Sequence, residues 1–186
     1  MNNSKFKEII KIGLTLFAIT AVSATLLATV NKMTAPVIAE NQTKKTYASM
    51  EKVMPEAKDF QPIEITDLEK ISEAYTALDE NGEEIGVCVI SASYGYGGEI
   101  RVLTGISEGK VTGIEILSHS ETPGLGAKTA NPEFKAQFAG KSADILLVKS
   151  GASENQINAI SGATISSNAV TTAVNNALEF SSEVVK

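Results

Sequence analysis

The residues best placed to do chemistry lie in the segment 161–164, which reads Ser-Gly-Ala-Thr and stands directly before a helix-like run. Its serine and threonine supply hydroxyl groups, and its glycine and alanine leave room for a ligand to approach the backbone. Ser166 and Ser167 add two further hydroxyls. A helix start carries unpaired backbone N–H groups and a partial positive charge, so this loop suits a phosphate. An ordinary helix N-cap formed by Ser166 or Ser167 is the alternative for the same residues.

Two glycine-rich segments precede this loop in the sequence. Residues 94–98 read Tyr-Gly-Tyr-Gly-Gly, and residues 119–126 read His-Ser-Glu-Thr-Pro-Gly-Leu-Gly. Glycine at this density marks backbone that turns with positive φ or that approaches another group closely. Each segment alone is equally consistent with a tight turn or with a ligand contact.

The elements that must position these segments are predicted from hydrophobic periodicity. Behind the Ser-Gly-Ala-Thr segment, apolar pairs recur every four positions and predict a helix to about Phe180. Two hairpins are predicted upstream, one around the Asn-Gly pair at 81–82 and one around residues 107–110. Their strands are 73–78, 84–92, 99–106 and 111–117, followed by a short helix at 131–138, a strand at 143–148 and a polar loop at 150–158.

An apolar stretch without charges runs from residue 12 to residue 30. At about 1.5 Å per residue its length matches the hydrocarbon core of a bilayer, so it predicts one membrane-spanning helix. A cleaved signal peptide is the rival, with Val22-Ser23-Ala24 as a cleavage-like site. The apolar run continues beyond that site, which favours an uncleaved anchor.

Charges near the anchor predict its orientation. Lys5, Lys7 and Lys11 lie close to the membrane on the short side, which favours a cytoplasmic N-terminus and an external domain. The predicted organisation is a tail and anchor at 1–32, a helical stalk at 33–57 and an external domain at 58–186. The fold class is therefore α+β, with one transmembrane helix before an antiparallel sheet domain with flanking helices.

Composition excludes several classes of function. The chain of 186 residues has a net charge of −6, which argues against a nucleic-acid partner. Its single cysteine, Cys88, allows no disulfide within the chain and no iron–sulfur site of its own, and reads as a buried strand residue. The one histidine, His119, gives no recognisable zinc site.

The three segments together resemble the FMN-binding domain family. That family shows a glycine-rich turn, a strand pair, a Glu-Thr-Pro-Gly-Leu-Gly loop and a Ser-Gly-Ala-Thr motif in the order found here, over roughly residues 73–178. The resemblance implies FMN joined as a phosphoester to Thr164, with Ser161, Gly162 and Ala163 as the rest of the motif. The family usually has an acidic residue where this chain has Asn158.

The resemblance also implies contacts and partners. The glycine-rich segment 119–126 would lie against the flavin ring, and Ser166 would lie near the phosphate. Such a chain would relay electrons as a subunit of an ion-translocating oxidoreductase in a bacterial inner membrane, with little turnover alone. Its partners would be other subunits, a flavin transferase and membrane lipid. The predicted contacts to the ring are made by Glu121, Thr122, Leu125, Gly126 and Lys128.

Other functions share the same outline. A flavin sensor or a subunit of another external reductase would use the same motifs. A pilin-like structural protein would also combine an apolar N-terminal helix with an α+β head. The apolar run here lacks both the short basic leader ending in glycine and the acidic residue just inside it that a pilin would show.

Overall fold

A helix of 51 residues, α1 (Asn3–Val53), opens the chain in the computed structural model, which describes residues 3–65 and 70–184. The part of α1 up to Lys44 forms a unit of its own. Its most apolar window of 18 residues has a mean hydropathy of 1.9 and is not buried. Leu14, Phe17 and Leu27 are 68%, 70% and 72% exposed. A helix this long with an apolar surface suits lipid, which confirms the predicted N-terminal span as a candidate membrane anchor.

The second unit, from Lys45 onward, is built on a five-stranded antiparallel sheet. Each strand pairs with its neighbours in chain order, so the sheet is a meander. Both predicted hairpins are present. The strands are β1 (Asp59–Pro62), β2 (Ile71–Leu78), β3 (Glu84–Tyr94), β4 (Glu99–Ser107) and β5 (Lys110–Ser118).

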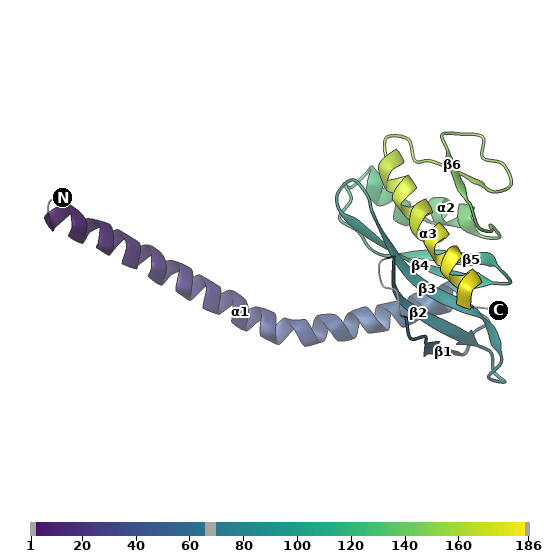
Figure 1. Ribbon diagram of the computed structural model, residues 1–186, viewed down its shortest axis with the longest axis horizontal. Coiled ribbons are helices and arrows are strands. Elements are labelled where there is room, and N and C mark those ends of the chain that lie inside the picture. Colours follow the sequence, from purple (N-terminus) through teal and green to yellow (C-terminus); the bar gives the residue numbers. More distant parts are fainter. Residues whose placement is uncertain (1–2, 66–69, 185–186) are drawn as a thin grey trace. The chain divides into compact units, whose positions relative to one another are not determined.

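Helix α3 (Thr164–Val184) packs across one face of the sheet, chiefly on β3 and β4 (Figure 1). The predicted apolar stripe faces the sheet, because Val170 and Val174 are fully buried and Ala173 lies between them. Ser91 on β3 donates a hydrogen bond of 2.7 Å to the Ala173 carbonyl. This hydrogen bond fixes the position of α3 along β3, and so helps to place the start of the helix relative to the sheet.

The end of α1 covers the other face of the sheet. Met50 is fully buried there, and Val53 and Met54 are nearly so, in one cluster with Leu103 of β4. A side chain at Gly105 would collide with Thr112 and press on Val53, so this glycine allows the close approach. Thr112 Oγ1 also donates to the Val53 carbonyl. The core therefore has two clusters, one under α3 and one under the end of α1, and residues 45–54 contribute to the second.

Several short elements follow the sheet. The predicted helix at 131–138 is present as α2 (Pro132–Lys135) and the 3-10 turn η2 (Ala136–Phe138). A further 3-10 turn, η1 (Gly126–Ala130), was not predicted. The strand β6 (Leu146–Val148) forms a parallel pair with β7 (Gln156–Asn158).

The structure corrects three predictions. Residues 59–62 form the edge strand β1, which the predicted set of strands did not include, because their backbone pairs with β2. Residues 156–158 form β7 inside the predicted polar loop. Helix α3 begins at Thr164, so Ser166 and Ser167 lie inside its first turns and neither is the N-cap.

Cys88 lies on β3 with no exposed surface, as predicted. Burial raises the pKa of its thiol to about 12. The thiol therefore stays neutral and inert at physiological pH, and Cys88 acts as a small apolar core residue.

Candidate functional site

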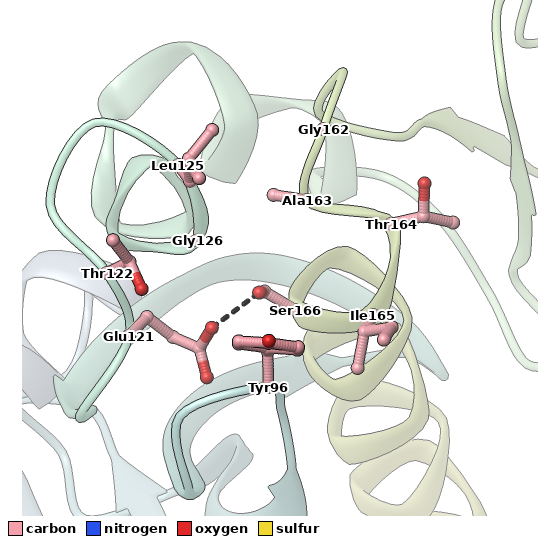
Figure 2. Close-up of a pocket in the computed structure, with 10 residues that line it drawn as sticks. All are labelled: Tyr96, Glu121, Thr122, Leu125, Gly126, Gly162, Ala163, Thr164, Ile165 and Ser166. Carbon is pink, nitrogen blue, oxygen red and sulfur yellow. Dashed lines mark hydrogen bonds between the residues drawn. The ribbon is translucent and has the colours of Figure 1, made fainter.

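Three segments that are distant in the sequence meet beside the start of α3 and enclose a cavity of about 450 Å³ (Figure 2). They are the turn 94–98 between β3 and β4, the loop after β5, and the Ser-Gly-Ala-Thr segment with the first turn of α3. A cavity of this size suits a cofactor or another small organic ligand. It is lined by Tyr96, Glu121, Thr122, Leu125, Gly126, Gly162, Ala163, Thr164, Ile165 and Ser166.

The Ser-Gly-Ala-Thr segment makes a tight turn into α3. Gly162 has φ of +77°, a left-handed conformation that a side chain would strain. The N–H of buried Ala163 donates to the Ile160 carbonyl at 2.9 Å. Thr164 is the first residue of the helix and is exposed. The turn therefore presents the Thr164 hydroxyl beside the helix start, whose first N–H groups have no acceptor within the helix.

The hydroxyls of Ser166 and Ser167 already make hydrogen bonds within the fold. Ser166 Oγ is buried and donates to Glu121 Oε2 at 2.6 Å. Ser167 Oγ is buried, donates to the Ala163 carbonyl at 2.9 Å and accepts the Ile160 N–H at 3.0 Å. Figure 2 shows the Thr164 hydroxyl at the rim, directed away from Ser166 and Glu121. A modifying enzyme could therefore reach the hydroxyl of exposed Thr164, whereas the hydroxyls of Ser166 and Ser167 are buried.

The structure brings eight of the ten predicted site residues together around the cavity. Ser161 is exposed on the turn before Gly162, and Lys128 is exposed on η1, and neither lines the cavity. Two lining residues were missed, Tyr96 and Ile165. Tyr96 stands in the predicted glycine-rich turn, and Ile165 is an exposed apolar residue directly after the motif, so both carried a signal in the sequence.

The lining fits a flavin. Tyr96, Leu125 and Ile165 are 76%, 47% and 55% exposed and offer apolar and aromatic surface to a planar ring. The start of α3 offers N–H groups to a phosphate. Glu121 is the one charged residue among the described lining residues. No group of three or more potential metal ligands was found in the parts of the chain that the structure describes.

Asn158 stands three residues before Ser161 and holds the loop that leads to the motif. Its Oδ1 accepts the Ala152 N–H at 3.1 Å, and its backbone N–H donates to Gln137 Oε1 at 2.8 Å. An aspartate at this position could accept the same Ala152 N–H.

Comparisons with known proteins agree with this geometry. The sequence model of the FMN-binding domain matches residues 95–179, which include the three segments except Tyr94, and that of the RnfG N-terminal region matches residues 1–53. The chain therefore contains an FMN-binding domain behind its N-terminal helix.

Relatives that match over most of the chain are also found. The chain is 41% identical to the G subunit of the Na(+)-translocating ferredoxin:NAD(+) oxidoreductase complex of Acetobacterium woodii, over 94% of this chain and 92% of that protein. It is 37% identical to the G subunit of the ion-translocating oxidoreductase complex of Methanosarcina acetivorans, over 95% and 96%. Its fold resembles the crystal structure of Shewanella oneidensis NqrC, with a TM-score of 0.52 and 21% identity over 68% of this chain and 67% of that one.

Proposed function

The chain belongs to the family of G subunits of ion-translocating oxidoreductase complexes, and on this premise we propose that it is the flavoprotein subunit of an Rnf-type ferredoxin:NAD oxidoreductase. The observation that carries the proposal is the likeness to such subunits over nearly the whole length of both chains. The FMN-binding domain and the cavity around the start of α3 supply a place for the cofactor.

We propose further that FMN is joined to Thr164 through a phosphoester. The exposed hydroxyl at the helix start supports this, as do the buried, hydrogen-bonded states of Ser166 and Ser167. The ester would leave one negative charge on the phosphate. Backbone N–H groups at the start of α3 would stabilise that charge by about 0.3–1 kcal/mol from the helix dipole.

When bound, FMN supplies the electron-transfer chemistry, and the protein holds and orients it. Thr164 would tether the phosphate end. Tyr96, Leu125 and Ile165 would shield the ring from water, and the 121–126 loop would set its position. No side chain needs to act as acid, base or nucleophile during electron transfer, so the chain alone would show little turnover.

The partners follow from this role. Electrons must come from and pass to cofactors in other subunits of the complex. A flavin transferase would form the ester, and lipid would surround the apolar part of α1. The alternative is that the chain is the C subunit of a sodium-pumping NADH:quinone oxidoreductase. The identity between this chain and Shewanella oneidensis NqrC is 21%, so that likeness supports a shared fold and no shared function. The relatives at 41% and 37% identity favour the Rnf assignment.

The function is tested by complementation. Membranes of a strain that lacks this chain should lose ferredoxin-dependent NAD reduction, and the full-length protein should restore it. A denaturing gel of the restored membranes should show flavin fluorescence at the mass of this chain. Full activity in the deleted strain would contradict the proposed role in the complex.

We also propose that the FMN-binding domain lies outside the cytoplasmic membrane, because Lys5, Lys7 and Lys11 favour a cytoplasmic N-terminus. Residues 1–32 would form the tail and anchor, and the stalk predicted at 33–57 would join the anchor to the domain predicted at 58–186. On the packing described above, residues 45–57 would belong structurally to that domain.

Protease accessibility tests this orientation. Protease added to intact cells without their walls should remove the domain and leave the anchor. A cytoplasmic protein serves as the control for membrane integrity. Cleavage that begins only after the membrane is opened would place the domain on the cytoplasmic side.

A further inference from the structure

The side chain of Glu121 is buried at the point where the three walls of the cavity meet. It is 5% exposed, although a free carboxylate is strongly hydrated. Its Oε1 accepts the Gly97 N–H at 2.9 Å, from the turn 94–98, and its Oε2 accepts the Ser166 hydroxyl at 2.6 Å, from α3. One side chain thus joins its own loop to the two other segments. Figure 2 shows the link to Ser166.

The surrounding backbone leaves room for this carboxylate. A Cβ at Gly95 would collide with Oε1 and with Ile100, and a Cβ at Gly126 would collide with Oε2 and with Ser166 Oγ. A Cβ at Gly97 would collide with the Ser120 carbonyl. Glycines of both loops are therefore required by the close packing around Glu121, in addition to any approach of a ligand.

The loop that carries Glu121 is also held in place. The Glu121 N–H donates to His119 Nδ1 at 3.2 Å, and the N–H groups of Leu125 and Ala127 both donate to the Thr122 carbonyl at 3.2 Å. The turn 94–98 is closed by the Gly95 N–H and the Gly98 carbonyl at 2.8 Å. Each segment is thus ordered locally, and Glu121 supplies side-chain hydrogen bonds between segments.

We propose that Glu121 is a positioning residue that holds the turn 94–98, the 121–126 loop and the first turn of α3 in the arrangement that seats the ring of the bound flavin. This inference rests on the proposed function and deepens it. Each carboxylate oxygen accepts one hydrogen bond from the protein. Glu121 therefore acts on the ring through the turn 94–98 and the loop backbone, in addition to the direct contact that the sequence predicts.

The test compares Glu121→Ala with Glu121→Gln in the full-length protein. Alanine removes both hydrogen bonds. Glutamine keeps an oxygen for the Gly97 N–H, and its amide group can donate to Ser166 Oγ. Glu133→Ala is the matched control, because Glu133 is exposed on α2. The first readout is the fluorescence anisotropy of the flavin tethered to Thr164, which reports whether the ring is seated.

The second readout is hydrogen exchange, measured in a Thr164→Val background so that it does not depend on flavin. Glu121→Ala should speed exchange of the Gly97 amide about tenfold, the loss expected for one hydrogen bond. Exchange in the centre of β3 should not change. Ser166→Ala removes a single hydrogen bond and should produce a smaller effect of the same sign, which keeps the test informative if Glu121→Ala does not fold.

The expected result is lower anisotropy and faster exchange in Glu121→Ala, with both restored in Glu121→Gln and unchanged in Glu133→Ala. Wild-type values in both Glu121→Ala and Ser166→Ala would overturn the proposal. So would a Glu121→Gln protein as disordered as Glu121→Ala, because the charge would then matter and the two hydrogen bonds would not. A wild-type protein without flavin would contradict the proposed function, and the exchange experiment would still test Glu121.

Discussion

Replacing Thr164 by valine should abolish covalent flavin in this protein. Valine keeps the branched shape of threonine and removes the hydroxyl oxygen that would form the ester. Because Thr164 is exposed at the first position of α3, the substitution should leave the fold and the helix start intact. In-gel flavin fluorescence after denaturation should fall to background, and ferredoxin-dependent NAD reduction by the complex should fall with it.

Two variants serve as controls for this loss. Thr164→Ser keeps a hydroxyl on the same Cβ and should retain covalent flavin. Ser166→Ala removes a buried hydroxyl that is bonded to Glu121 and should also retain it. Covalent flavin that persists in Thr164→Val, or that disappears in Ser166→Ala alone, would move the attachment site away from Thr164.

Removing residues 1–54 should unfold the domain, whereas removing residues 1–33 should leave it folded and soluble. The longer deletion takes away Met50, Val53 and Met54, which cover one face of the sheet. Burial of each such side chain contributes about 1.5–3 kcal/mol. Their combined loss is comparable to the entire net stability of a typical domain, about 5–15 kcal/mol.

Circular dichroism and thermal unfolding of the two fragments measure this difference. The fragment that begins at Thr34 should unfold in one cooperative transition. The fragment that begins at Pro55 should aggregate or show no transition. Equal melting temperatures for the two fragments would mean that the end of α1 does not contribute to the core.

The parts of the fold that are local in sequence could be predicted from the sequence. The apolar pairs of α3 recur at helical spacing, and the hairpin at Asn81-Gly82 has the turn chemistry that its backbone needs, with Gly82 at φ of +79°. Asp79 also accepts the N–H groups of Glu83 and Asn81, which lower the pKa of its carboxyl group. Each of these elements is determined by residues that lie within a few positions of one another.

The parts that depend on distant contacts could not be predicted in this way. Strands β6 and β7 form a parallel pair, and each has only three residues. Three residues are too few to show the apolar periodicity that predicts a strand. Met50 and Val53 would show the same apolar pattern in a helix that is a free stalk and in a helix that packs against a sheet. The roles of the serines also depend on tertiary structure, because Ser166 is directed to Glu121 by the packing of α3.

The candidate site shows the same division. The three motifs were predicted to lie together because their order resembles that of a known family, and the cavity brings most of their residues together. The orientation of each side chain could not be predicted from the sequence. Glu121, which the sequence predicts as a ligand contact, lines the cavity and also links two neighbouring segments through hydrogen bonds. Tyr96, which the sequence places in a turn, lies exposed at the cavity.

The central claim is that FMN is joined to Thr164, and mass spectrometry of the protein extracted from its native membrane tests it most directly. The intact mass should exceed that of the chain by the mass of FMN less one water. Trypsin cleaves after Lys149 and should release residues 150–186 as one peptide that carries this addition, which fragmentation should assign to Thr164. A chain without the addition, or an addition on any other residue, would contradict the account.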